Sequence, residues 1–250
     1  MTVSRAIVLV IAGIGGGLTG SIAGLASLVT YPVLLAVGLA PVTANVTNSV
    51  ALVFSSVGSV VGSRPELAGQ ADRVRRLALA GVAGGAAGGA LLLVTSSDTF
   101  EMIVPWLVAV ASVAMLLRGR LVDVATADAH RSGPGLLAAV AAVGVYSGYF
   151  GAGAGVALLA LLLHAVRDTM PRSNAVKNVV LGLGNGIAAV GFMVFGDVRW
   201  AYVAPLGAGL LIGGSLGPIV VRRSPVRPLR IIIGVAGLGL AVKLGFDAYT

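Results

Sequence analysis

The longest uncharged stretch of the chain reads AIVLVIAGIGGGLTGSIAGLASLVTYPVLLAVGLAPVTANVTNSVALVFSSVGSVVGS, residues 6–63. These 58 residues include no Asp, Glu, Lys, Arg or His. One helical crossing of a bilayer needs roughly 20 apolar residues, so the stretch is long enough for two crossings and a connection. Its apolar residues do not alternate with polar ones as in a barrel strand, so the stretch predicts membrane helices.

The rest of the chain has the same character. Of its 250 residues 57% are hydrophobic and 10% are charged, whereas a soluble domain carries about 25% charged residues. This composition excludes a water-soluble enzyme and a disordered chain, and the lack of cysteine excludes a disulfide-stapled domain. We predict an all-α integral membrane protein, a single polytopic domain over residues 1–250. Its eight hydrophobic segments are about 6–36, 41–63, 77–96, 101–118, 134–164, 172–196, 200–221 and 228–248.

The net charge of +8 comes from basic residues that flank these segments, where they contact lipid head groups rather than nucleic acid. If segments 1–4 each cross once, Arg5, Arg64–Arg76 and Arg118–Arg131 share one side, which the positive-inside rule makes cytoplasmic. We therefore expect a protein of the plasma (inner) membrane with a cytoplasmic N-terminus. The topology of the second half stays open. Its arginines lie outside with eight simple crossings, and inside if segment 134–164 dips in and returns.

The first segment has an alternative interpretation as a secretory signal. Arg5, the apolar stretch after it and the small residues Ser21-Ile22-Ala23 resemble a cleavable leader. Cleavage would remove half of a glycine pattern that recurs later in the chain, so we favour a retained membrane segment.

The chain contains an internal repeat. A shift of 130 positions lays Pro41–Gly62 over Pro171–Phe192 and brings Asn48 into register with Asn178. We expect repeats of about 5–118 and 134–248, joined by a basic loop at 119–133. Duplicated halves around a shared central site are typical of transporters.

Glycines support a break in the first segment of each repeat. Gly15-Gly16-Gly17 and Gly151-Ala-Gly153-Ala-Gly155 are dense enough to weaken a helix. Either close packing or an unwound stretch would explain them, so segments 1 and 5 are candidates for broken or re-entrant helices. In segments 3 and 7 the default interpretation is helix packing. The glycines there recur every four residues, as Gly81, Gly85, Gly89 and Gly209, Gly213, Gly217.

All nine carboxylates lie in loops or at segment ends. Cation exchangers and proton relays need a carboxylate at bilayer depth, so a cation substrate is disfavoured. No histidine or carboxylate within a segment supplies a nucleophile–base pair or a metal cluster. We therefore expect no enzymatic activity, no cofactor and no metal site.

The polar residues that do enter the membrane are neutral or positive. In segment 6 one lysine lies among asparagines, and segment 2 offers hydroxyl and amide groups at matching positions. Such donors around a single ammonium suit a small oxyanion, so we predict a substrate-binding site shared by both halves. The alternatives are a lysine that reaches the head groups and asparagines that bond across helices. The predicted site residues are Thr47, Asn48, Asn174, Lys177 and Asn178.

Two copies of one motif resemble a known family. The first reads Gly20-Ser-Ile-Ala-Gly24 with Tyr31-Pro32, followed by Pro41-Val-Thr-Ala-Asn-Val-Thr-Asn48. The second reads Gly148-Tyr-Phe-Gly151-Ala-Gly153-Ala-Gly155, followed by Pro171-Arg-Ser-Asn-Ala-Val-Lys-Asn178. Over nearly the whole chain, this arrangement resembles the TauE/SafE sulfite exporter family.

The resemblance implies a permease that moves small sulfur-containing anions, such as sulfite or organosulfonates, usually outward. Its expected partners are a small anionic substrate and the lipid bilayer. In the first copy the chain reads Ala23-Gly24-Leu25-Ala26-Ser27 in place of the usual Gly-x-Gly-Gly-Gly, which leaves the ligand open. A transporter or channel for another small solute, and a non-transporting membrane scaffold, are the alternatives.

Overall fold

The computed structural model describes residues 2–127, 133–165, 168–223 and 227–249, and within these ranges the chain forms helices and no strand. The prediction of an all-α membrane protein is confirmed. Five of the described helices (α1, α3, α5, α9 and α10) are long and apolar enough to span a bilayer. The helices are α1 (Val3–Ala23), α2 (Ala26–Ala36), α3 (Pro41–Gly62), α4 (Arg64–Leu67), α5 (Ala71–Val94), α6 (Ser97–Ala127), α7 (Pro134–Tyr149), α8 (Ala154–Ala165), α9 (Met170–Phe195), α10 (Trp200–Arg223) and α11 (Arg227–Tyr249).

Segments 1 and 5 are each divided into two helices. The first break, at Gly24 and Leu25, separates α1 from α2, and the second, Phe150–Gly153, separates α7 from α8. With 11 and 12 residues, α2 and α8 are about 16 and 18 Å long, too short to cross a hydrocarbon core of about 30 Å. Elsewhere α6 continues to Ala127, into the range expected to be the connecting loop, and residues 128–132 lie outside the described part of the chain.

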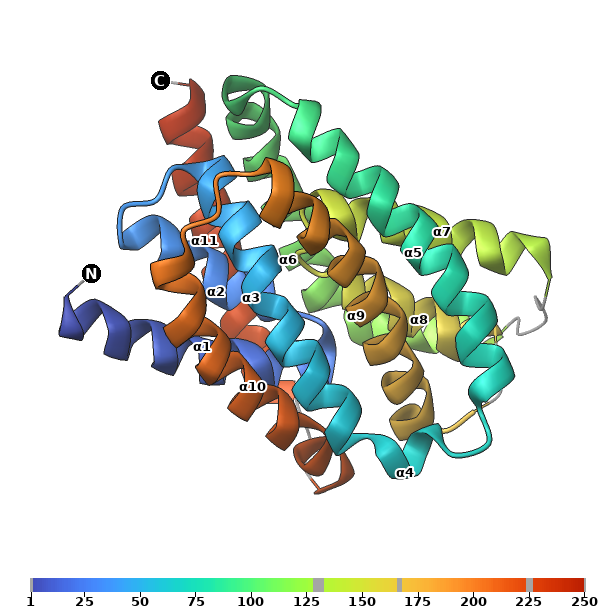
Figure 1. The fold of residues 1–250 in the computed structure, drawn as a ribbon. Helices are drawn as coiled ribbons and strands as arrows, with labels where there is room; N and C mark the ends of the chain where they lie inside the picture. Colours follow the sequence, from blue (N-terminus) through green and yellow to red (C-terminus); the bar gives the residue numbers. More distant parts are fainter. Residues whose placement is uncertain (1, 128–132, 166–167, 224–226, 250) are drawn as a thin grey trace.

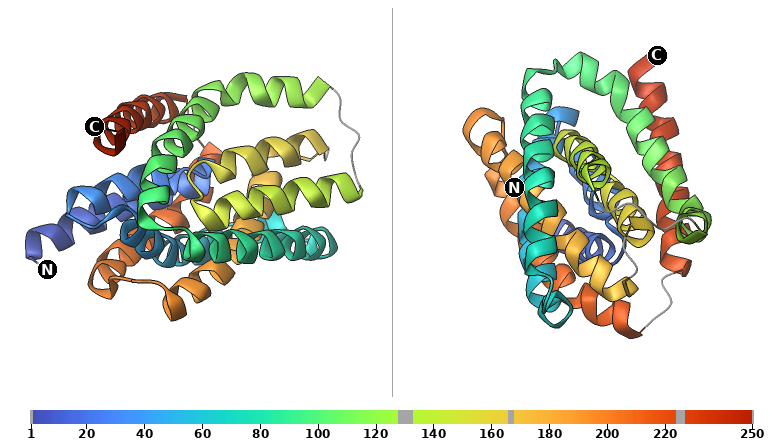
Figure 2. Two further views of the ribbon diagram at one scale, coloured as in Figure 1. Left: turned by 90° about the horizontal axis from the view of Figure 1, so that it is seen from above. Right: turned by 90° about the vertical axis from the view of Figure 1, so that its right-hand side faces the viewer.

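Helices α1 and α2 form an antiparallel hairpin. A Cβ atom built on Gly16 would lie 2.5 Å from Thr30 Cγ2, and one on Gly20 would lie 2.7 Å from Ala26 Cβ. These contact pairs converge toward the break, so α2 returns along α1. Helices α7 and α8 fold back in the same way, and Figure 2 shows the two hairpins entering the molecule from opposite ends.

The hairpin corrects our expectation for the first segment. Since α2 returns, segment 1 does not cross once, and the start of α1 lies on the same side as the start of α3. We call this side, where α1, α3, α6 and α10 begin, the N-terminal side, and the other the opposite side. Helix α3 then carries the chain across, so Arg5 and the basic stretch Arg64–Arg76 lie on different sides. The premise behind a cytoplasmic N-terminus, that segment 1 crosses the membrane once, therefore fails. Segment 134–164 dips in and returns, which is one of the two arrangements that the sequence left open.

Each hairpin packs against the other half of the chain. Helix α1 runs parallel to α10, with Gly13 against the backbone of Leu206–Leu210, and α7 runs parallel to α5, with Gly84 against Ala141. Figure 1 shows α10 beside both α1 and α3, while α5 lies beside α7 and α9. The glycines of segments 3 and 7 lie against neighbouring helices, where a Cβ would overlap backbone or side-chain atoms, so their prediction as packing residues is confirmed.

Helices α3 and α9 run antiparallel through the middle of the molecule. Asn185 of α9 donates to the carbonyl of Ser49 in α3 at 2.9 Å, and Gly182 faces Ser56. On one face α6 and α11 lie side by side (Figure 2), joined where the Tyr249 hydroxyl donates to the carbonyl of Met102. The centre is therefore enclosed by two hairpin tips and two crossing helices.

Candidate functional site

The two hairpin tips meet at the centre of the molecule. A Cβ built on Gly24 would lie 2.1 Å from the Cα of Gly155, so the two backbones are in direct contact. Beside this contact lies a cavity of about 80 Å³. Roughly 10–15 Å³ of such volume holds one water molecule, so the cavity has room for a small solute. Its walls come from α1 and the start of α2, from α3, from the α7–α8 break, and from Lys177, Asn178, Leu181, Gly182 and Asn185 of α9.

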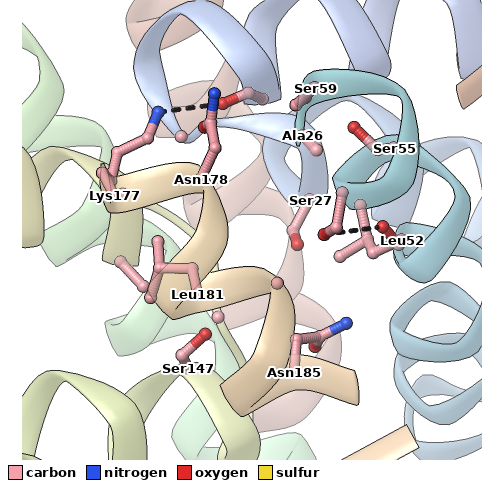
Figure 3. A pocket seen from close by; sticks show the side chains of 17 residues that line it. Ala26, Ser27, Leu52, Ser55, Ser59, Ser147, Lys177, Asn178, Leu181 and Asn185 are labelled. Carbon is pink, nitrogen blue, oxygen red and sulfur yellow. Dashed lines mark hydrogen bonds between the residues drawn. The ribbon is translucent and has the colours of Figure 1, made fainter. Parts of the chain in front are cut away.

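Lys177 is fully buried in this wall. Its Nζ donates to the carbonyl oxygens of Gly20 and Ser21, both at 3.3 Å. Because α1 ends at Ala23, its last carbonyls have no donor within the helix, and a cation is favourable at that end of the helix dipole. Figure 3 shows Lys177 and Asn178 pointing from α9 toward the break. The alternative of a lysine that extends to the lipid head groups is therefore excluded.

Two asparagines of α9 contact the same carbonyl. Asn174 and Asn178 each donate through Nδ2 to Ser21 O, at 2.9 and 3.4 Å. Ser21 O thus accepts from three side chains of the other half of the protein. Asn178 also lines the cavity, whereas Asn174 is not among the described lining residues.

At the second break, a side-chain amide bonds the carbonyl at the end of α7. Asn45 of α3 donates from Nδ2 to the carbonyl of Tyr149, the last residue of α7, at 2.9 Å. Within the break, the Tyr146 hydroxyl donates to the carbonyl of Ala152 at 2.5 Å. The carbonyl end of each broken helix is therefore bonded by side chains.

The helix ends that remain facing the cavity are N-termini. Ala26 and Ser27 begin α2, Ala154 and Gly155 begin α8, and all four line the cavity. A helix N-terminus presents N–H groups and partial positive charge, which favour an anion. The two breaks thus have side chains bonded to their carbonyl ends, while the first residues of α2 and α8 line the cavity together with Lys177.

Comparison with known proteins identifies the family. The family model described as Sulfite exporter TauE/SafE matches residues 9–244. The chain belongs to the TauE/SafE sulfite exporter family. It is 26% identical over 237 residues to the probable membrane transporter protein YfcA of Escherichia coli K12, covering 93% of this chain and 87% of that protein. It is 25% identical over 235 residues to the probable membrane transporter protein ORF9 of Sinorhizobium sp, covering 92% and 88%. No solved structure matches the chain.

Family membership and these relatives identify the protein as a membrane transporter. In this TauE/SafE protein the five predicted site residues do not form one cluster. Lys177 and Asn178 line the cavity, and Asn174 joins them at Ser21 O. Asn48 accepts from the Thr30 hydroxyl at 2.5 Å and donates to Ser27 Oγ at 3.2 Å, so it positions a lining residue without lining the cavity itself.

Thr47 lies away from the others. Its hydroxyl is buried and accepts the backbone N–H of Arg199 at 3.1 Å, at the connection between α9 and α10. Thr47 corresponds to Lys177 in the repeat, but the structure does not direct it to the cavity of this TauE/SafE protein.

Sequence reasoning missed several polar residues of the cavity wall. Some had a usable signal: Asn185 follows Asn178 by seven residues, and Ser59 follows Ser55 by four, so each pair shares a helix face. Ser27 and Ser147 had none, because only the folding of the hairpins brings them to the cavity. Among the described residues, no group of three His, Cys, Asp or Glu could hold a metal ion in this TauE/SafE protein.

Proposed function

We propose that this protein is a permease for small sulfur-containing anions, sulfite or organosulfonates, and that it exports them. The observation that supports this most is the buried ammonium of Lys177 in the wall of a central cavity. A charge within a membrane protein is costly, and such residues commonly lie on substrate pathways. The starts of α2 and α8, which line the cavity, and the amide of Asn178 offer neutral donors suited to an oxyanion.

The contact between the hairpin tips suggests how access could alternate. Each hairpin enters from its own side of the membrane and ends at the cavity, with Gly24 against Gly155. We propose that the halves rock about this contact, so that the anion reaches the cavity from one side at a time. The cavity itself argues against a non-transporting scaffold, whose interior would be filled by side chains.

The charge distribution supports an orientation in the plasma membrane. We propose that the opposite side is cytoplasmic, which puts the N-terminus outside. Of the Lys and Arg residues that the structure describes, only Arg5, Arg199 and Lys243 lie near the N-terminal side. A basic cytoplasmic face would also concentrate anions at the entrance for export. Nine of the 17 Lys and Arg residues lie at or near described helix ends on the opposite side, and Arg118 and Arg120 lie in the later part of α6. The nine are Arg64, Arg73, Arg75, Arg76, Arg172, Arg222, Arg223, Arg227 and Arg230.

Flux through reconstituted vesicles tests the proposal. Lys177→Ala should abolish saturable sulfite and sulfonate flux, because the anion would lose its one cationic partner in the cavity. Lys243→Ala removes an exposed charge from α11 and should leave flux unchanged. Size-exclusion profiles and thermal unfolding check that both variants fold. Unchanged flux in a folded Lys177→Ala variant would refute this role for Lys177.

A further inference from the structure

A groove of about 580 Å³ lies where α9 runs between α3 and α5 (Figure 1). Its walls are Val82 of α5 together with residues from 53–61 of α3 and from 179–190 of α9. Of the twelve residues that line it, Ser56 alone is polar, and the others are apolar or glycine. Val57 in its wall is 51% exposed, so the groove opens to the surroundings of these helices, which in a membrane are lipid.

Two glycines of α9 leave space in the groove. Gly182 and Gly186 lie about one helical turn apart, and both line it. A Cβ built on Gly186 would meet no atom within 4 Å, so no protein atom fills the space beside it. Proteins are otherwise close-packed, and a wall without neighbouring atoms loses its dispersion contacts. Apolar walls hold water poorly, so hydrocarbon is the filling that this groove favours.

The length and depth of the groove match one leaflet of a bilayer. Residues 53–61 extend about 12 Å along α3, and residues 179–190 extend about 16 Å along α9. One leaflet supplies about half of a hydrocarbon core of about 30 Å. Because α3 spans Pro41–Gly62, Val53 lies near its middle and Val61 at its end on the opposite side. The groove therefore lies within the leaflet of the opposite side and has room for one of its acyl chains.

Arginines lie where this groove reaches the membrane surface. Arg64 follows Val61 by three residues. Arg75 precedes Val82 by seven residues, which places it on the same face of α5, about 10 Å nearer the opposite side. Both arginines are exposed. Residues 64–76 contain four arginines and two carboxylates, so this end of the groove is net positive and complements a lipid phosphate.

From this fit we propose that the groove binds an anionic phospholipid, with one acyl chain along α9 and the phosphate near Arg64 and Arg75. The inference does not depend on which solute the protein transports. Ser56 and Gly182 line both the groove and the central cavity, so the bound chain lies directly beside that cavity. A lipid fits better than a second copy of the chain, because the groove has the length of one leaflet and ends at basic residues.

Native mass spectrometry of the purified protein tests the occupant. The protein is delipidated in detergent and then supplied with phosphatidylglycerol or phosphatidylcholine of identical acyl chains. The first lipid is anionic and the second is zwitterionic. The wild type should retain phosphatidylglycerol at least about fivefold more than phosphatidylcholine, which is the effect of one basic residue near an anionic head group. The same spectra report whether the protein is a monomer or a dimer.

Two substitutions, each with a matched control, assign the binding to the groove and to its basic end. Gly186→Leu places a side chain in the groove and should abolish lipid retention. Gly239→Leu adds the same side chain to α11, where a Cβ also meets no atom within 4 Å, and should retain phosphatidylglycerol as the wild type does. Arg75→Gln should lower phosphatidylglycerol retention about fivefold and leave phosphatidylcholine unchanged. Arg5→Gln, at an exposed position on the N-terminal side, should change neither.

The outcomes decide between lipid and protein as the occupant. Equal retention of the two lipids, or unchanged retention in Gly186→Leu, would overturn the proposal. A lipid-free wild-type dimer that Gly186→Leu converts to a monomer would assign the groove to a second copy of the chain. Thermal unfolding checks each variant, and if Gly186→Leu does not fold, unchanged phosphatidylglycerol retention in Arg75→Gln would still overturn the proposal. None of these results bears on the anion flux that tests the proposed function.

Discussion

The two helix breaks share a topology but not a chemistry. At the first break, two residues separate the helices, and Ser21 O accepts from the ammonium of Lys177 and from two amides. At the second, four residues separate them, and the Tyr149 carbonyl accepts from the amide of Asn45. Both halves of the chain therefore contain a hairpin that ends at the centre, while a side chain of α9 alone supplies the charge in the described cavity wall.

The two breaks also differ in how they are held. The second contains two glycines in the left-handed region, Gly151 at φ +79° and Gly153 at φ +77°, and a hydroxyl from its own hairpin bonds the break. The first has one such glycine, Gly24 at φ +74°, and besides its own backbone bonds it is held by three side chains of α9. The first break thus depends on tertiary contacts more than the second does.

The largest effect is expected where the two breaks touch. In Gly24→Ala the new methyl group would overlap the backbone of Gly155 at a residue with positive φ. Overpacking costs about 1–3 kcal/mol and the left-handed conformation about 1–2 kcal/mol more. Gly155→Ala causes only the steric overlap and should therefore lose less stability. Chemical or thermal unfolding in detergent measures both losses, and we expect flux to fall with them.

A third glycine provides the control for these variants. At Gly186, in the middle of α9, no atom lies within 4 Å of an added Cβ. Gly186→Ala should therefore stabilise the protein by about 0.5–1 kcal/mol through helix propensity alone. If Gly24→Ala and Gly155→Ala behaved like Gly186→Ala, the hairpin tips would not be in contact.

Exchanging the equivalent residues tests whether the charge can act from either copy. The double variant Lys177→Thr with Thr47→Lys keeps the composition but moves the ammonium to α3. We expect flux to stay at background, because the side chain at position 47 faces the N–H of Arg199 and not the cavity. Vesicle flux measures the outcome, and restored transport would mean that the two positions are interchangeable.

A smaller loss of stability is expected when one hydrogen-bond donor is removed from the carbonyl of Tyr149 or from that of Ser21. Asn45→Leu leaves the buried Tyr149 carbonyl without the amide that bonds it, which costs about 1–3 kcal/mol of unfolding free energy. Asn174→Leu should cost less than about 1 kcal/mol, because Ser21 O keeps Lys177 and Asn178 as donors. Equal losses in unfolding experiments would contradict the difference between the breaks.

The smallest effect is expected at the two ends of α9. Asp168 pairs with Arg73 at 2.9 Å and with Arg172 at 3.1 Å, and only 14% of its side chain is exposed. Asp168→Asn should cost up to about 1 kcal/mol, and less at high salt. Asp197, whose pair with Arg199 is more than half exposed, should tolerate Asp197→Asn without measurable loss. The opposite order of losses would exclude a structural role for the Asp168 pairs.

Most of the fold could be predicted from the sequence, because segments that contact lipid must be apolar and so are visible in the composition. Uncharged runs marked the long apolar helices, and Gly151, Gly153 and Gly155 marked the second break. The cluster Gly15-Gly16-Gly17 lies within α1, however, and the first break comes later, at Gly24 and Leu25. The argument for a cytoplasmic N-terminus lost its premise because a hairpin and a single crossing of residues 6–36 have the same hydropathy. Contacts between α1 and α2, such as that of Gly16 with Thr30, distinguish them.

For the site, polarity at bilayer depth was sufficient to find Lys177 and Asn178. It could not give the direction of Thr47, because polarity does not say which neighbour a hydroxyl faces, and this hydroxyl faces the backbone N–H of Arg199. The serines at the breaks could not be found for another reason: only the folding of each hairpin brings Ser27 and Ser147 to the cavity.

The packing of α1 against α10 has a consequence for biosynthesis. The glycine face of α1, with Gly13 and Gly17, fits the backbone of Leu206–Gly214. Its partner emerges from the ribosome almost 200 residues later, whereas α7 finds α5 already made. The earliest helix must therefore wait in the bilayer with an exposed groove until translation is nearly finished, so assembly of the whole bundle is delayed to its last helices.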